Sequence, residues 1–381
     1  MNTKIRLTLM NFLQYAVWGA WLISLGAYLG NTLKFDGLQI GSFFATMGIA
    51  SLFMPAVMGI IADRWIPAQR LLGLCHLFYM PTIALSNSVA YNALEKAGLD
   101  TVTHFPPIRV WGTVGFICAM WVVDLGKMGL SATQLYFSAT LGLILGLYSF
   151  TLPNCPINRS GGGKSIVDLL GLRAFALFKQ RKMAIFFIFS MLLGMSLQIT
   201  NAFADGYIKS FGDTGIHGAK YLGTFGVEHS TILISLSQIS ETLCILLIPF
   251  FLKRFGIKRV MLIAMFAWVL RFALLGAGNP GPGVWMFILS MIVYGVAFDF
   301  FNISGSLFVE KETSAAIRSS AQGVFMIMTN GLGALIGSYL AGWVVNHYGW
   351  PLSWYLFAGF SLVVAIVFAV IFKYKHDPNR I

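Results

Sequence analysis

Residues 351–372 read PLSWYLFAGFSLVVAIVFAVIF and contain no charged side chain. A helix needs about 20 apolar residues to cross the ~30 Å hydrocarbon core of a bilayer, so this stretch predicts a membrane-spanning helix. Ten further apolar stretches precede it, at residues 8–31, 38–62, 71–93, 106–124, 132–152, 183–208, 229–252, 260–277, 284–309 and 319–346. The sequence therefore predicts an all-α polytopic membrane protein with about eleven helices.

The overall composition agrees with helices that face lipid. Hydrophobic residues make up 57% of the 381-residue chain and charged residues only 10%. Soluble domains typically carry about 25% charged residues, so this chain cannot cover a water-facing surface. A transmembrane β-barrel would instead show short alternating segments, which the sequence lacks.

The net charge of +12 does not indicate a nucleic-acid partner. Nearly all cations lie in short loops between apolar stretches, which is the positive-inside pattern of membrane proteins. The four cysteines form no CxxC pair and predict neither a disulfide framework nor a metal site. No metal-ligand set and no nucleophile–base pair stands at motif spacing, so we expect no enzyme and no cofactor.

A basic stretch, residues 153–182, divides the chain. Its cations are Arg159, Lys164, Arg173, Lys179, Arg181 and Lys182, against the single acid Asp168. Cationic loops resist translocation, so we expect this linker, the N-terminus and the C-terminus to be cytoplasmic. The predicted domains are an N-terminal helical bundle at 1–152, the linker at 153–182, and a six-helix C-terminal bundle at 183–381.

The predicted topology of the first half contains a conflict. Its two ends are both expected in the cytoplasm, but five apolar stretches precede the linker. An odd number of crossings cannot leave both ends on one side. Either one stretch does not cross fully, or one crossing is missing from the chain.

Two helical bundles joined by a basic loop are the plan of major facilitator transporters, which bind substrate between their halves. A loop motif supports this reading. The sequence Gly59-Ile-Ile-Ala-Asp63-Arg64 resembles the G-x-x-x-D-R/K gating loop of that superfamily. The second half has a cationic loop, KRFGIKR at 253–259, in the comparable place.

Polar side chains inside spanning helices are costly, so they are candidates for function. In the first half, FPPIRVWGTVGF (105–116) places Arg109, Thr113 and Phe116 on one helix face at spacing i, i+4, i+7. These groups would suit the wall of a wet cavity. The alternative is that Arg109, near the start of its helix, extends to the interface.

The second half offers three comparable sets at helical spacing. They are Gln198 with Asn201, Gln238 with Glu241, and Tyr294, Phe298 and Asn302 with the adjacent Asp299. Arg271 is a possible partner for either carboxylate. Helix–helix packing is the alternative role for the amides, and an internal salt bridge is the alternative for the charges. The inventory suits a neutral ligand with hydroxyls and a flat face.

Long stretches carry a resemblance to a known family. They include FLQYAVWGAWL (12–22), FPPIRVWGTVGF (105–116), SQISETL (237–243), MIVYGVAFDFFNISGS (291–306) and AIRSSAQGVFMIMTNGLG (316–333). With these, nearly the whole chain resembles the bacterial nucleoside:proton symporters, the nucleoside permease and xanthosine permease branch of the major facilitator superfamily.

The resemblance implies a twelve-helix fold and proton-driven nucleoside uptake across the bacterial inner membrane, with the proton gradient as energy source. It implies a substrate site formed by Arg109, Thr113, Phe116, Gln198, Asn201, Gln238, Glu241, Tyr294, Phe298 and Asp299. Glu241, Asp299 and Arg271 are the candidates for proton coupling. We expect a monomer in the lipid bilayer.

The chain departs from the family plan at one place. Residues 71–77, LLGLCHL, run directly into 78–82, FYMPT, so the start of a third helix joins the middle of a fourth. We infer that roughly 30 residues are absent, about one helix plus a loop. We expect stretch 71–93 to cross only in part or to re-enter, with the place of the third helix largely empty.

Two alternatives remain open at this point. One is a carrier for another polyol, such as a sugar. The other is a family member whose shortened first half impairs transport. The sequence ranks neither purine against pyrimidine nucleosides nor proton against sodium coupling.

Overall fold

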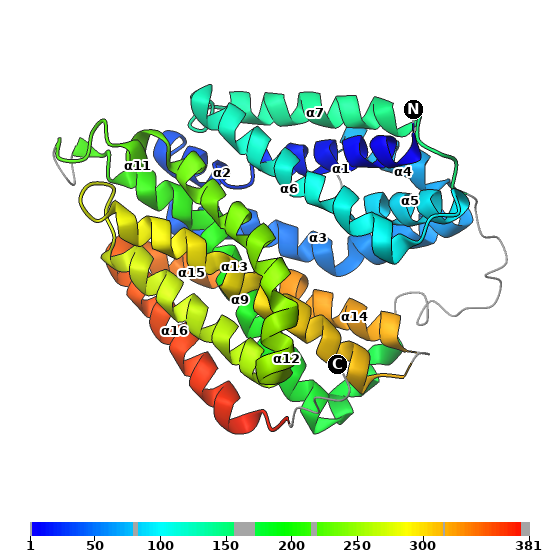
Figure 1. Ribbon diagram of the computed structural model, residues 1–381. Coiled ribbons are helices and arrows are strands. Elements are labelled where there is room, and N and C mark those ends of the chain that lie inside the picture. Colours follow the sequence, from blue (N-terminus) through cyan, green and yellow to red (C-terminus); the bar gives the residue numbers. More distant parts are fainter. Residues whose placement is uncertain (1, 79–82, 156–171, 215–218, 315–316, 375–381) are drawn as a thin grey trace. The chain divides into compact units, whose positions relative to one another are not determined.

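The computed structural model describes residues 2–78, 83–155, 172–214, 219–314 and 317–374. These residues are helical in every view, with loops between the helices and no strand among them (Figure 1). The prediction of an all-α protein is therefore confirmed. Contacts between residues group the chain into two compact units, each described by itself below.

The first unit contains residues Met1–Leu25 and Ala50–Leu170. Its helices are α1 (Thr3–Gly19), the second part of α3 (Gly37–Arg64), α4 (Ala68–Phe78), α5 (Ile83–Lys96), α6 (Thr101–Leu125) and α7 (Thr133–Ser149). Helix α1 packs along α6 and α7, and α4 packs along α7.

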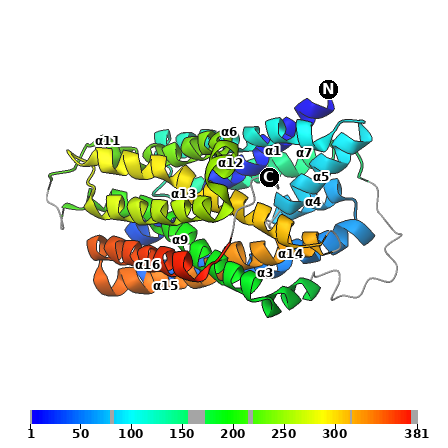
Figure 2. The ribbon, with the colours of Figure 1, turned by 60° about the horizontal axis from the view of Figure 1, so that its bottom comes forward.

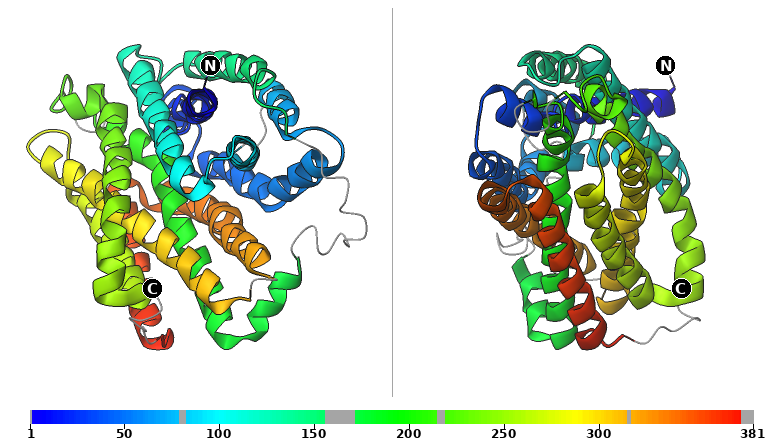
Figure 3. Two further views of the ribbon diagram at one scale, coloured as in Figure 1. Left: turned by 45° about the vertical axis from the view of Figure 1, so that its right-hand side comes forward. Right: turned by 90° about the vertical axis from the view of Figure 1, so that its left-hand side faces the viewer.

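The second unit contains residues Gly26–Ile49 and Gly171–Ile381. Besides the short α2 (Leu25–Ala27), η1 (Tyr28–Thr32), η2 (Leu172–Lys179) and α11 (Phe225–Glu228), it holds the longer helices. These are α9 (Arg181–Ser210), α12 (Ser230–Ala277), α13 (Val284–Glu312), α14 (Arg318–Met326), η3 (Ile327–Gly333), α15 (Ala334–Tyr348) and α16 (Trp350–Ile371). Helix α12 packs along α13 and α16, and α9 along η3 and α15 (Figures 2 and 3).

The boundary between the two units falls inside α3. The units therefore differ from the two bundles that a division at the basic linker would give. This grouping records which helices pack together. The predicted bundles at 1–152 and 183–381 and the linker at 153–182 stay a prediction. Residues 156–171 of that linker lie outside the described ranges.

Most predicted spans coincide with long helices. Within the described ranges, seven helical stretches are long and apolar enough to cross a membrane. Helices α1 and α7 have 17 residues each, or about 26 Å at 1.5 Å per residue, and come close to the same length. Both the apolar sequence and the helix lengths thus fit a polytopic membrane protein.

Two predicted spans, 229–252 and 260–277, are joined end to end in the 48-residue α12. Gly256 interrupts this helix with φ 75° and ψ 165°. This left-handed backbone conformation costs glycine little, because it has no Cβ. The bend lies in the cationic loop KRFGIKR, so two spans meet there as the sequence predicts.

The predicted span 71–93 is two short helices and not one. Helix α4 ends at Phe78 and α5 begins at Ile83, while residues 79–82 lie outside the described ranges. At 1.5 Å per residue, the 11 residues of α4 reach about 17 Å and the 14 of α5 about 21 Å. Neither reaches across the ~30 Å core of a bilayer.

Both outer ends of this helix pair meet one residue, Asn154. The Gln69 Nε2 atom donates to Asn154 Oδ1 at 2.7 Å, and the Lys96 ammonium donates to the Asn154 carbonyl at 3.4 Å. Helix α4 begins at Ala68 and α5 ends at Lys96, so the pair leaves one end of the first unit and returns to it. The two helices therefore form a hairpin whose ends lie together. That stretch 71–93 crosses the bilayer only in part or re-enters stays a prediction.

The number of crossings in the first half stays a prediction, as does the largely empty place of the third helix. If the hairpin does not cross the bilayer, α1, α3, α6 and α7 would give the first half an even number of crossings.

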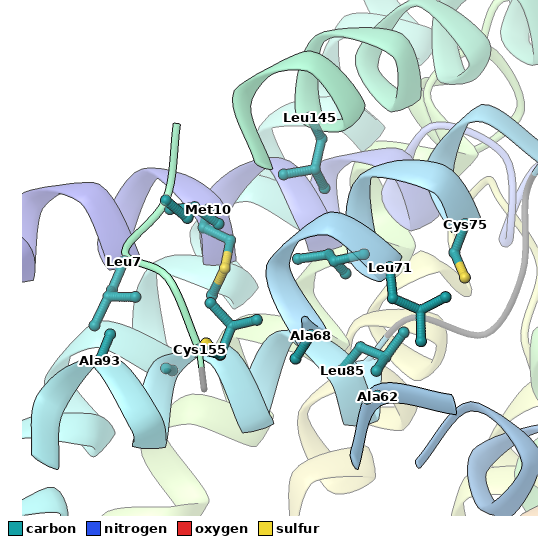
Figure 4. Close-up of a cluster of buried hydrophobic side chains, with 14 of the residues drawn as sticks. Leu7, Met10, Ala62, Ala68, Leu71, Cys75, Leu85, Ala93, Leu145 and Cys155 are labelled. Atoms are coloured by element: carbon teal, nitrogen blue, oxygen red, sulfur yellow. The ribbon is translucent and has the colours of Figure 1, made fainter. Parts of the chain in front are cut away.

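The hairpin is packed tightly on the first helix. Leu71 and Cys75 of α4 and Leu85 of α5 belong to one buried cluster with Leu7 and Met10 of α1 (Figure 4). Because these side chains are at most 5% exposed, the short helices are held by a close-packed apolar core.

A polar contact joins the same helices. The His76 Nε2 atom lies 2.9 Å from Gln14 Oε1, and both side chains are buried. The amide oxygen accepts, so the imidazole nitrogen donates. The hairpin is therefore fixed to α1 by a hydrogen bond as well as by apolar packing.

Candidate substrate-binding site

The first unit presents its candidate residues on α6, against α1. The Arg109 guanidinium carbon lies 3.9 Å from the centroid of the Tyr15 ring. Thr113 is half-buried and Phe116 is buried. Arg109 is half-buried and stacks on a ring of the neighbouring helix. This contact favours a role inside the bundle over extension to the interface.

Gly112 makes this stacking possible. A Cβ atom at this position would lie 2.6 Å from the Tyr15 ring and 3.0 Å from the Arg109 guanidinium. Any larger residue would push the tyrosine away from the arginine. Tyr15 was not among the predicted site residues, although it stands in the family-like stretch FLQYAVWGAWL.

In the second unit, α9 presents two amides. Gln198 is only 8% exposed, and its Oε1 atom has no hydrogen-bond partner within the described ranges. Asn201 is half-buried one turn further along the same helix. A buried acceptor without a partner costs about 1–3 kcal/mol, which a ligand donor would recover.

Helix α13 provides the aromatic surface. The Tyr294 and Phe298 rings stack with centroids 5.8 Å apart and an interplanar angle of 11°. The Trp268 ring of α12 meets Tyr294 edge-on at 6.0 Å. The predicted spacing i, i+4 thus produces a continuous aromatic face. Trp268 of α12 extends this face, and the sequence analysis did not predict it.

Arg271 is fully buried beside this face. Its Nη1 atom donates to the Ser290 carbonyl at 2.7 Å, and its guanidinium carbon lies 4.6 Å from the Tyr294 ring centroid. The Ser290 hydroxyl donates back to the Arg271 carbonyl at 3.0 Å. This reciprocal pair fixes the arginine between α12 and α13.

Tyr294 lies among the charged residues of this unit. Glu241 and Asp299 are within electrostatic reach of its side chain, and the Arg271 guanidinium carbon lies 4.6 Å from its ring centroid. Asp299 is 3% exposed, whereas Gln238 and Glu241 are half-buried. The partnership of Arg271 with either carboxylate stays a prediction.

A second buried charge cluster was not predicted. Asp205 of α9 accepts from the Lys209 ammonium at 2.7 Å, and from the hydroxyls of Ser230 and Thr231 at 2.5 and 3.2 Å. The signal was present in the sequence, since a lysine four residues after an aspartate can pair with it on one helix face. This cluster joins α9 to the start of α12.

The predicted gating-loop residues occupy the last turns of α3. The helix includes Gly59, Asp63 and Arg64, but their side chains lie outside the described part of the chain. Within the described residues, no group of three or more His, Cys, Asp or Glu side chains could hold a metal ion.

Comparison with known proteins identifies the family. The sequence model for "Nucleoside H+ symporter" matches residues 1–78 and 76–377. This chain belongs to the nucleoside H+ symporter family. The resemblance read from the sequence is therefore confirmed.

Two relatives from Escherichia coli (strain K12) are similar over nearly their whole length. The chain is 50% identical over 410 residues to the nucleoside permease NupG, covering 99% of this chain and 97% of the relative. It is 48% identical over 415 residues to a xanthosine permease, covering 100% and 98%. These relatives are transporters and not enzymes, as predicted for this chain.

Solved structures agree with the fold. A crystal structure of the nucleoside transporter NupG is similar with a TM-score of 0.89 and 50% identity, covering 98% of this chain and 100% of that chain. A crystal structure of a POT family transporter in complex with 5-aminolevulinic acid has a TM-score of 0.67 at 13% identity, covering 97% of this chain and 96% of that chain. The similarity to the POT family transporter concerns the fold alone.

The comparisons also locate the departure from the family plan. The two matched pieces meet at residues 76–78, the join inferred from the sequence. The alignment to NupG extends over 410 positions, more than the 381 residues of this chain, so the relative has residues that this chain lacks. The region in which this chain departs from the family model is therefore the α4–α5 hairpin.

Proposed function

We propose that this chain takes up nucleosides by proton symport across the bacterial inner membrane. The observation that supports it most strongly is that two carboxylates and an arginine lie around Tyr294, whose ring stacks on Phe298. A neutral molecule with hydroxyl groups and one flat face matches this chemistry. Family membership narrows that class to nucleosides.

The proposed binding roles follow from the side-chain chemistry. The rings of Phe116, Phe298 and Tyr294 flank the base, since π-faces stack on a heterocycle at ~1–3 kcal/mol per base. The amides of Gln198, Asn201 and Gln238, together with Glu241, bind hydroxyls and base edges. Arg109 and Thr113 contribute donors from α6.

The proposed coupling groups are Glu241 and Asp299. A buried carboxylate needs a proton, a counter-ion or water, because an isolated charge in low dielectric is expensive. Arg271 and both acids lie around Tyr294, so proton binding at either acid would change the electrostatic balance around the substrate site. Substrate binding and proton binding are thereby linked.

Transport would proceed by alternating access, driven by the proton gradient without a cofactor. We propose that the chain acts as a monomer, with the N-terminus, the basic linker and the C-terminus in the cytoplasm. The Gly59, Asp63 and Arg64 loop would contribute to gating on that side.

One structural observation favours a second candidate function. The short helices α4 and α5 of the first unit stand where the two pieces matched by the family model meet. A member shortened in this way can keep its substrate site and lose the movement that carries substrate across. Binding without transport would be the mark of this candidate.

Calorimetric titration of the detergent-solubilised chain separates the proposals. Uridine is expected to bind, and a sugar such as maltose is expected not to compete. Binding of maltose with no binding of uridine would replace the nucleoside proposal with a polyol carrier. Binding of uridine without uptake in vesicles would support the second candidate.

A further inference from the structure

The bend in α12 carries an exposed basic surface that the proposed transport leaves unexplained. The sequence KRFGIKR places four cations within seven residues there. Lys253, Arg254 and Arg259 are exposed. Lys258 is half-buried and donates to the Ala369 carbonyl of α16 at 3.0 Å. Three of the four cations are therefore open to a partner outside the chain.

No acid among the described residues neutralises these three cations. The ion pairs within the described ranges engage Lys182, Lys209 and Arg318, and none reaches the bend. The Arg254 guanidinium carbon lies 5.8 Å from the centroid of the Phe255 ring, near the outer limit of a cation–π contact. The positive charge of the bend is thus available to an anionic partner.

An exposed apolar face of α12 leads directly to these cations. The four most exposed apolar side chains in the first part of this helix are 49–74% exposed, and they are Leu243, Leu246, Leu247 and Phe250. Their spacing i, i+3, i+4, i+7 places them on one helix face. Lys253 and Arg254 follow Phe250 by three and four residues and therefore continue the same face.

The length of this face matches one leaflet of a bilayer. Arg254 follows Leu243 by 11 residues (254 − 243), which is about 17 Å along a helix at 1.5 Å per residue. Half of the ~30 Å hydrocarbon core is about 15 Å. If the apolar face lies along the acyl chains, the cations at its end reach the level of the phospholipid headgroups.

The bend adds a further cation from the second part of α12. Gly256 turns the chain with φ 75° and ψ 165°, and Arg259 stands three residues later. The hydrogen bond from Lys258 to α16 holds the chain on this side of the turn. Cations from two spans are thereby gathered at one end of the second unit.

We propose that the α12 bend binds the headgroup of an anionic phospholipid of the inner leaflet, with an acyl chain along the apolar face. The two guanidinium groups of Arg254 and Arg259 suit the paired oxygens of a phosphate, and Lys253 adds a compact charge. Clusters of Lys and Arg at the membrane end of a helix attract anionic lipids. This inference uses the predicted cytoplasmic side of the loop and does not rest on nucleoside transport.

The test compares two lipids that differ only in headgroup. Binding of phosphatidylglycerol and phosphatidylcholine with the same acyl chains is measured by native mass spectrometry on the detergent-solubilised full chain. The site variant is Lys253→Gln/Arg254→Gln/Arg259→Gln. The matched control removes three other exposed cations of the second unit and is Lys179→Gln/Arg181→Gln/Lys373→Gln. Inorganic phosphate is added as a competitor without acyl chains.

The wild type and the control variant are expected to bind phosphatidylglycerol roughly ten-fold or more tightly than phosphatidylcholine. Each cation near an anionic surface contributes roughly five-fold to binding. The site variant should bind the two lipids about equally, and inorganic phosphate should not displace phosphatidylglycerol from the wild type. Should the site variant not fold, Arg254→Gln alone should lose roughly five-fold of the preference.

Four results would overturn the inference. A site variant that keeps the wild-type preference would place the lipid elsewhere. An equal loss in the control variant would show an effect of net charge and no site at the bend. A wild type without any preference would leave these cations a role in orienting the chain only. Displacement by inorganic phosphate would show a site for free anions and not for a lipid.

Discussion

The Lys96 ammonium donates to the carbonyl oxygen of Asn154 at 3.4 Å, so α5 ends where the basic linker of the chain begins. Asn154 also accepts from Gln69 at the other end of the α4–α5 hairpin. The two contacts place the start and the end of the hairpin at one end of the first unit. The chain lacks about one helix in this region. A hairpin with both ends on one side would let the later helices keep the orientation that the family plan gives them.

The first prediction concerns the topology of the hairpin. In a chain whose four native cysteines are replaced by serine, Lys96→Cys should resist a membrane-impermeant thiol reagent added to intact cells. It should react in inverted membrane vesicles, because position 96 lies beside the cationic linker. Lys127→Cys, between α6 and α7, is the control and should react from outside. The reverse pattern would show that the first half had inverted.

The second prediction concerns how the hairpin is held. His76→Leu should lower the thermal unfolding temperature of the purified chain, because Gln14 Oε1 loses its 2.9 Å partner in a buried site. Such a loss costs about 1–3 kcal/mol. The double variant Gln14→Leu/His76→Leu should recover part of it, since both polar groups are then gone. An unchanged unfolding temperature in His76→Leu would remove this contact from the account.

The third prediction concerns ligand affinity. Gln238→Ala and Asn201→Ala should each weaken uridine binding by roughly ten- to a hundred-fold, since each removes a polar contact in a site with little water. Titration calorimetry measures the effect. The exposed Asn346→Ala variant should bind like the wild type. Wild-type affinity in both site variants would exclude these amides from the site.

The fourth prediction concerns energy coupling. Asp299→Asn and Glu241→Gln are each expected to abolish uridine accumulation driven by a pH gradient in proteoliposomes. Each change keeps the shape of the side chain but removes its ability to take up and release a proton. Exchange of labelled for unlabelled uridine, which needs no gradient, should survive in at least one variant. Full accumulation in both would rule out these acids as coupling groups.

The sequence predicted most of the fold because long apolar stretches leave few alternatives in a membrane. Segments such as 183–208 and 351–372 correspond to α9 and α16 within a few residues. The aromatic residues Tyr294 and Phe298 were found from helical spacing, and they stack as that spacing predicts. What the sequence predicted well was therefore local order along single helices.

Contacts between helices were harder to predict. Nothing in the spacing of Trp268 or Tyr15 shows that they meet Tyr294 and Arg109, because these pairs depend on how neighbouring helices turn toward each other. The hairpin was foreseen from charge and parity, but its division into α4 and α5 required the structure. The sequence also did not reveal the π-helical stretch Ile327–Gly333.

Uptake of labelled uridine by bacterial cells that lack their own nucleoside carriers tests the central claim most directly. Cells producing this chain should accumulate uridine well above cells with an empty vector. A protonophore should abolish the accumulation, and excess inosine, but not excess maltose, should compete with it. Accumulation that is no higher than the vector control, with the chain present in the membrane, would contradict transport. Accumulation that the protonophore leaves unchanged would contradict proton coupling.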